Sequence, residues 1–143
     1  MSPRTRLDLP GRLPFRTTLG IRVTDLNYGG HLGNDAVLSL VHEARVRFLA
    51  AMGYSELDVE GLGIIMNDCV IVYLAQGHLG EELTVAAGAG EFTRTGCELF
   101  FRLTKADGSE LARVKTGITF FDYAAQKVRA VPEGFRARCQ AMA

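Results

Sequence analysis

The sequence predicts an α+β fold in which a curved antiparallel sheet of about five strands wraps around one long central helix. Three observations predict it: one long helical pattern, five segments with strand patterns, and short links between the last four of those segments. The chain has 143 residues, 48% of them apolar. This is enough for one domain with a sizeable core, and we expect that single domain to span residues 1–143.

The first strand is expected at residues 14–24. Apolar residues alternate there with polar residues and glycine, which is the period of two of a half-buried strand. The next segment, residues 25–34, holds three glycines and two asparagines. It is too flexible and too polar to continue the strand, so we expect a shaped loop.

The helix is expected to begin at an N-cap on Asn34 or Asp35 and to end near Gly53. Apolar residues recur in it at spacings of three and four: Val37, Leu40, Val41, Ala44, Phe48 and Ala51. Three more apolar residues lie off this stripe. A helix that is apolar over so much of its circumference must be largely covered by other structure, and from this we infer the curvature of the sheet.

Four further strands are expected at residues 64–76, 82–92, 97–105 and 110–122, with Asp107-Gly108 as a tight hairpin turn between the last two. Residues 134–142 have the pattern of a final helical turn or two. Asp68 interrupts the apolar run of the first of these strands. It either has a partner or a task there, or it marks with Asn67 a β-bulge or a strand end.

Charge and hydropathy exclude several classes of protein. Lys plus Arg and Asp plus Glu both number 16, so the long-range positive field of a general nucleic-acid binder is missing. The basic N-terminal stretch lacks the apolar run of a secretory signal, and no stretch reaches about 18 apolar residues. We expect a soluble, cytoplasmic protein that contacts neither nucleic acid nor membrane.

The sequence predicts neither a disulfide framework nor a metal site. Cys69, Cys97 and Cys139 form no CxxC pair and have no neighbouring histidine, so inert thiols are favoured over a nucleophile. His42 and His78 lack the spacing of metal ligands. We expect no metal and no cofactor.

Polar side chains are densest in the loop at residues 25–34, where Asp25, Asn27, His31 and Asn34 lead into the helix. The first amides of a helix have no intrahelical partner and carry the positive end of its dipole, so they can hold a developing negative oxygen. Glycines such as Gly30 allow a ligand to approach the backbone. The pattern is typical of an oxyanion-holding site with groups that orient water, and equally of a plain connection.

The stretch Arg22-Val-Thr-Asp-Leu-Asn-Tyr-Gly-Gly-His-Leu-Gly-Asn34, followed by His42-Glu-Ala-Arg45, resembles the hotdog-fold acyl-CoA thioesterases of the 4-hydroxybenzoyl-CoA thioesterase-like group. The resemblance is close around the loop and covers nearly the whole chain in the order of elements. It implies hydrolysis of an acyl- or aroyl-CoA, or of an acyl carrier protein thioester, to a free acid and a thiol. A sheet of this size has exposed edges that a second copy can pair with, so we expect a homodimer or a homotetramer. The resemblance implies that the cleft lies between subunits.

The family's residues are carried over one by one. Asp25 and Asn27 match two acidic positions, and Asn27 departs from the pattern because an amide cannot accept a proton at neutral pH. Asn34 falls where a main-chain amide polarises the thioester carbonyl. His31 matches the family's Gly-His position, and Glu43 matches the glutamate of its helix.

The residue that would remove a proton from water stays open at this point. Asp25 is the carboxylate nearest in sequence to Asn27, where the family has its second acidic residue. His31 is a candidate because the unperturbed pKa of histidine suits a base near neutral pH. Glu43 either faces the cleft or pairs with Arg47 one helical turn away. Asp68 is the fourth candidate.

Two further expectations follow from the resemblance. Arg94 lies where some members set basic residues against the phosphates of coenzyme A, and Gly30 and Asp68 are candidates for substrate contact. The asparagine at position 27 also favours a second hypothesis, in which the chain binds acyl thioesters without hydrolysing them.

Overall fold

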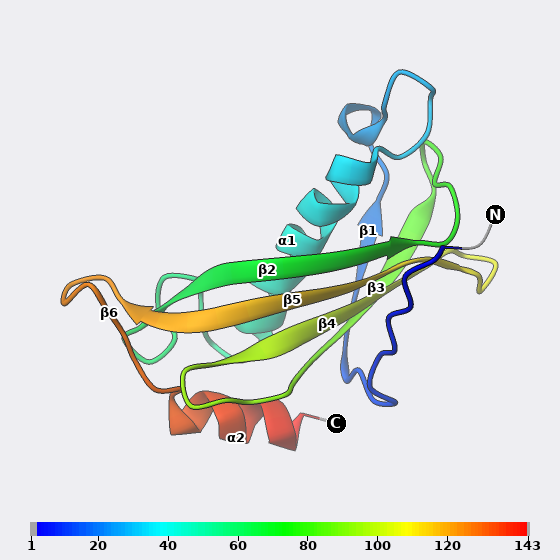
Figure 1. Ribbon diagram of the computed structural model, residues 1–143. Helices are drawn as coiled ribbons and strands as arrows, with labels where there is room; N and C mark the ends of the chain where they lie inside the picture. Colours follow the sequence, from blue (N-terminus) through cyan, green and yellow to red (C-terminus); the bar gives the residue numbers. More distant parts are fainter. Residues whose placement is uncertain (1–2, 143) are drawn as a thin grey trace.

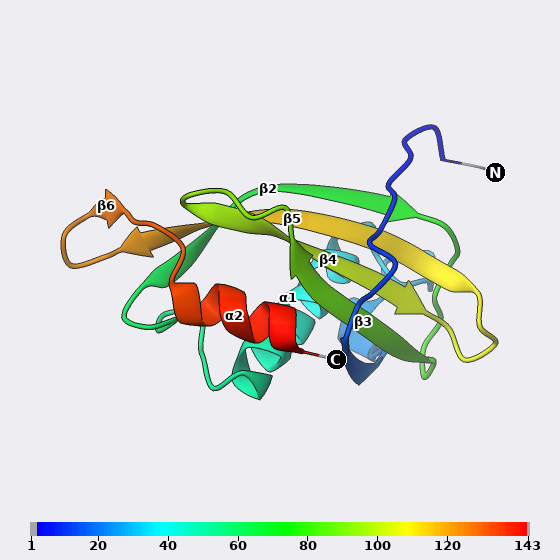
Figure 2. The same ribbon diagram turned by 90° about the horizontal axis from the view of Figure 1, so that it is seen from below.

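The computed structural model describes residues 3–142. A curved antiparallel sheet lies over one long helix, α1 (Asn34–Ala51), as Figures 1 and 2 show. The sheet order is β1-β3-β4-β5-β2, with β6 beside β5. The strands are β1 (Phe15–Gly20), β2 (Gly63–Tyr73), β3 (Glu82–Gly90), β4 (Gly96–Thr104), β5 (Glu110–Asp122) and β6 (Lys127–Val128). This confirms the predicted α+β architecture.

The core lies between α1 and the concave face of the sheet. Val41, Ala44 and Phe48 on the helix are buried together with Leu99 and Phe101 on β4. Strand side chains alternate between the two faces, so every second residue of β3, β4 and β5 contributes to this core. One flank of the helix stays open, since the side chains of His42, Glu43 and Val46 are exposed.

The predicted first strand is too long. β1 ends at Gly20, and residues Val23–Asp25 form a short 3-10 helix. The Asp25 carboxylate accepts a hydrogen bond from the Arg22 amide at 2.8 Å, which turns the backbone. The alternation continues through Ile21 and Val23 in the sequence, but Ile21 is buried whereas Val23 is 69% exposed.

The predicted N-cap was also wrong, because Gly33 holds this position and no side chain caps the helix. β2 ends at Tyr73, three residues earlier than expected, where the amides of Leu74 and Ala75 both donate to the Leu111 carbonyl. The register of β2 against β5 shifts between Met66 and Asp68. The bulge considered at Asn67 and Asp68 is therefore confirmed.

The C-terminal helix α2 (Glu133–Ala141) packs its Phe135 into the core at the far end of α1. The sixth strand, β6, was not predicted, because its turn has no glycine or proline and instead places Gln126 at a φ of 55°. Within residues 3–142, the structure has no helix of sufficient length and hydropathy to cross a membrane.

Candidate active site

The loop between β1 and α1 is held in one shape by Asn27. The backbone amide of Asn27 donates to the His31 carbonyl at 2.8 Å. The side-chain Oδ1 of Asn27 accepts from the backbone amides of Gly29 at 2.9 Å and His31 at 3.3 Å. Gly30 closes a tight turn at a φ of 82°, and its amide donates to the Asn27 carbonyl. The left-handed conformation favours glycine at this position.

A second segment, residues 75–78, fixes the loop from the other side. The amide of Leu32 donates to the Gly77 carbonyl at 2.8 Å, and His31 pairs with His78 in an isolated antiparallel bridge. The imidazole rings of His31 and His78 meet edge to face with centroids 5.2 Å apart. The position of His31 is therefore defined by both its backbone and its ring.

These elements enclose a cavity of about 420 Å³. Its lining consists of Asn27, His31, Leu32, Asn34, Val37, Tyr73, Ala75, Gln76, Gly77 and Leu111. The structure thus brings three of the predicted residues, Asn27, His31 and Asn34, to one cavity at the start of α1. The floor is apolar, because Val37, Leu111 and Leu32 belong to the core.

The helix start at this cavity carries free donors. Gly33 donates to the Asp25 carbonyl at 2.9 Å, and the amides of Ala36 and Val37 donate to the Gly33 carbonyl. Within residues 3–142, the amides of Asn34 and Asp35 have no acceptor. Such amides, at the positive end of the helix dipole, can stabilise an oxygen that becomes negative during a reaction.

Tyr73 reaches the same place from the end of β2. Its hydroxyl donates to the backbone carbonyl of Asn34 at 3.0 Å, and burial raises its pKa above the usual value for tyrosine. No feature of the sequence around Tyr73 predicts a catalytic role for it. The alternation Cys69, Ile71, Tyr73 is the signal that could have placed it on the helix side of the strand.

The structure gives Asp25 and Glu43 other partners. Asp25 is buried, and its carboxylate contacts the backbone and guanidinium of Arg22, not His31. Glu43 pairs with Arg47 at 2.9 Å, as the helical spacing predicts, and lines a different hollow between α1 and β1. Neither carboxylate lies with His31 in this chain.

Asp68 lies on the outer face of the sheet. It pairs in register with Gly117, whose neighbours Thr116 and Ile118 are buried on the helix side, so Asp68 points away from the helix. Its Oδ1 accepts a hydrogen bond from the Gly117 amide at 3.2 Å. The structure therefore places the whole sheet between Asp68 and the cavity at His31.

Arg94 lies in the turn between β3 and β4, at the end of the sheet next to α2 (Figure 1). Its carbonyl accepts from the Val131 amide at 2.9 Å, and its side chain is exposed. The loop of residues 22–33 lies at the opposite end of the sheet (Figure 1). Within the chain, Arg94 and the cavity at His31 are therefore far apart.

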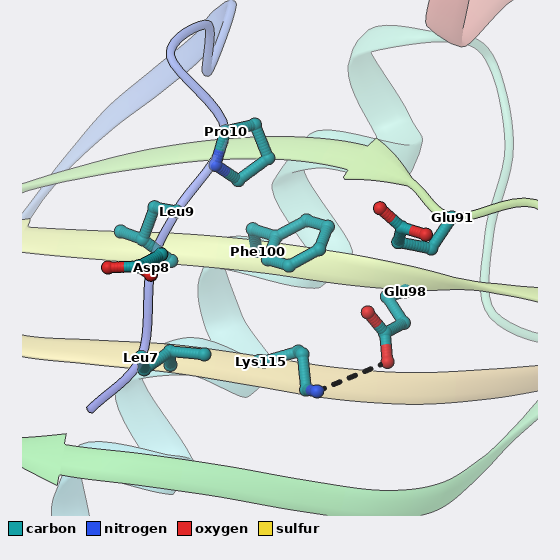
Figure 3. A pocket seen from close by; sticks show the side chains of 8 residues that line it. All are labelled: Leu7, Asp8, Leu9, Pro10, Glu91, Glu98, Phe100 and Lys115. Carbon is teal, nitrogen blue, oxygen red and sulfur yellow. Dashed lines mark ion pairs between the residues drawn. The ribbon is translucent and has the colours of Figure 1, made fainter. Parts of the chain in front are cut away.

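A larger hollow of about 470 Å³ lies on the outer face, where residues 7–10 cross the sheet (Figure 3). Lys115 is paired there with Glu98 at 3.3 Å, and Asp8 and Glu91 add further negative charge. Carboxylates repel phosphate groups, so this hollow is unsuited to a nucleotide thioester.

The three cysteines are free, and none has the features of an activated thiol. Burial raises the pKa of Cys97 well above its usual range, raises that of Cys139 to about 12, and raises that of Cys69. A thiol with a raised pKa is a poor nucleophile because it remains protonated.

Comparison with known proteins shows the family of the chain. The family model described as the thioesterase-like superfamily matches residues 21–139, which include the loop before α1, α1 itself and the strands β2 to β6. No curated protein matches the sequence.

Solved structures share the fold. A hypothetical protein from Staphylococcus aureus in complex with CoA is 20% identical, with a TM-score of 0.79 over 87% of this chain and 80% of that one. A 1,4-dihydroxy-2-naphthoyl-CoA thioesterase from Synechocystis is 17% identical, with a TM-score of 0.80 over 90% and 96%. A thioesterase superfamily protein from Jannaschia is 19% identical, with a TM-score of 0.81 over 93% and 85%. These likenesses confirm the predicted hotdog fold.

Proposed function

Because this chain belongs to the thioesterase-like superfamily, we propose that it hydrolyses an acyl- or aroyl-CoA, or an acyl carrier protein thioester, to a free acid and a thiol. We place it with the 4-hydroxybenzoyl-CoA thioesterase-like group. The observation that carries the proposal is the backbone amide of Asn34, which has no acceptor within residues 3–142 and belongs to a residue that lines the same cavity as His31. The CoA bound in the Staphylococcus aureus structure supports a CoA thioester as substrate.

In this mechanism His31 removes a proton from water, and the water oxygen attacks the thioester carbon. The carbonyl oxygen becomes negative and is held by the Asn34 amide. Collapse of this intermediate breaks the carbon–sulfur bond, and the departing thiolate takes up the proton that the imidazole received. Asn27 shapes the loop that carries His31 and so positions the water through this histidine, while Gly30 leaves open space for the substrate beside the backbone.

Asp25, Glu43 and Asp68 are assigned structural roles in this proposal. The carboxylate of Asp25 accepts a hydrogen bond from Arg22, and the carboxylate of Glu43 forms an ion pair with Arg47. The carboxylate of Asp68 accepts a hydrogen bond from the Gly117 amide. A proton acceptor must come within hydrogen-bond reach of the attacking water, and these three side chains face elsewhere.

The test is turnover of a substrate panel. The purified protein is offered short, medium, long and aromatic acyl-CoAs and an acyl carrier protein thioester, while the release of free thiol is followed. We expect steady thiol release from at least one member. Binding of panel members without any release would overturn hydrolysis and establish the second candidate, a non-catalytic acyl-thioester binding protein, which the amide of Asn27 favours.

We further propose that the cavity lies between the subunits of a homodimer or of a dimer of dimers. β1 and β2 are the edge strands, and Arg47 covers β1 by donating to the Thr18 carbonyl. The β2 edge instead exposes apolar side chains, with Met66, Tyr73 and Leu74 each 39% exposed. An exposed apolar edge favours pairing with a second copy.

Antiparallel pairing of two β2 strands would bring the Gly63 end of the partner beside Tyr73 and the cavity. The end of the sheet that carries Arg94 would approach with it, and there Arg94 could contact the phosphates of CoA. We expect sedimentation velocity to show a species of about twice, or about four times, the 15.6 kDa of the chain. A monomer at all concentrations would contradict the shared cleft.

A further inference from the structure

The hydroxyl of Tyr73 has a fixed orientation inside the cavity. Its proton is donated to the Asn34 carbonyl at 3.0 Å, and burial raises the pKa of Tyr73, so this proton stays in place. A hydroxyl has one proton and two lone pairs. With the proton committed to the protein, the hydroxyl oxygen offers the cavity only an acceptor.

The other polar groups of the cavity differ from this acceptor. The Asn27 Oδ1 is already occupied by the amides of Gly29 and His31. Within residues 3–142, no hydrogen bond fixes the side-chain amides of Asn34 and Gln76. Tyr73 and the ring of His31 are therefore the two side chains whose acceptor atoms the fold holds in position around the same cavity.

We propose that Tyr73 is a further catalytic residue, whose hydroxyl oxygen accepts a hydrogen bond from the attacking water; this rests on the proposed hydrolysis. One hydrogen of the water points to His31 and the other to Tyr73, so that a lone pair points to the thioester carbon. The first proton passes to the imidazole as the carbon–oxygen bond forms. Tyr73 keeps its own proton throughout, and the thiolate leaves with the proton from the imidazole.

The structural alternative is that Tyr73 only ties the end of β2 to the start of α1. The two roles differ in how they affect a nucleophile other than water. A distorted cavity would slow attack by every nucleophile, whereas the loss of an acceptor for water would slow hydrolysis selectively. Hydroxylamine is a suitable competitor, because it is a stronger nucleophile and converts a thioester to a hydroxamate that is measured separately from the acid.

The experiment compares Tyr73→Phe with the unchanged protein on the best substrate of the panel, with and without hydroxylamine. We expect kcat for hydrolysis to fall about tenfold with KM within about twofold. The enzymatic ratio of hydroxamate to acid should rise about tenfold.

Equal slowing of both reactions, or an unchanged kcat, would overturn the role of Tyr73 while leaving the proposed hydrolysis in place. A raised KM at unchanged kcat would also overturn it, because the hydroxyl would then bind the substrate and not the water. Absence of turnover in the unchanged protein would instead remove the proposed function, and this inference with it.

Discussion

Replacement of Asn34 by proline should lower kcat by about 10²- to 10³-fold while the protein stays folded. Asn34 is the first residue of α1, and its amide has no acceptor within residues 3–142. Proline lacks this N–H and is well tolerated at the first position of a helix. The preceding residue, Gly33, already has a φ of −68° and a ψ of 148°, which a following proline permits.

Asn34→Ala is the matched control, because it removes the side chain but keeps the amide. We expect it to retain most of the activity. Steady-state kinetics on the best panel substrate, together with thermal unfolding, separates the two effects. Equal kcat values in the proline and alanine variants would show that the Asn34 amide does not hold the thioester oxygen, and the main support for a hydrolytic centre would be lost.

The free backbone amide of Asn34 could be anticipated from the sequence, because the residues that predict it are neighbours in the chain. The loop residues Asn27, His31 and Asn34 are close in the chain, so the turn that precedes the helix must bring them near its first amides. The helix itself and the strand at 110–122 were predicted nearly to their ends, because their apolar periodicity is long and regular.

The remaining features depend on contacts between distant segments. Whether Asp68 faces the helix or the outside follows from the bulge at Asn67, which shifts the register of β2 by one residue. A shift of this kind exchanges the two faces of a strand. Tyr73 reaches Asn34 across 39 positions of sequence, and no local pattern indicates that bond.

The end of the first strand was predicted too late for a different reason. The alternation of apolar and polar residues continues to Thr24, yet the chain leaves the sheet after Gly20. A carboxylate that bonds to the backbone three residues earlier competes with strand pairing, as Asp25 does with Arg22. Periodicity reports which side chains are apolar, and it does not report this competition.

In the proposed hydrolysis, the same contacts leave His31 as the group that we expect to accept the proton of water. The side-chain amide of Asn27 cannot accept a proton at neutral pH. The carboxylates of Asp25 and Glu43 are each bonded to an arginine. His31 is half-buried at the cavity wall, and a neutral imidazole has one ring nitrogen that can accept a proton. Its neighbour His78 is paired with Glu81 at 2.9 Å and does not line the cavity.

His31→Gln should therefore lower kcat about 10²-fold or more with little change in KM. Glutamine keeps a polar side chain of similar reach, and the hydrogen bonds of the His31 backbone with Asn27 remain. His42→Gln is the matched control, because His42 is exposed on α1 and bonds to Glu56 away from the cavity. A loss below about threefold, measured by thiol release, would remove His31 from the mechanism, since general-base catalysis contributes far more than this.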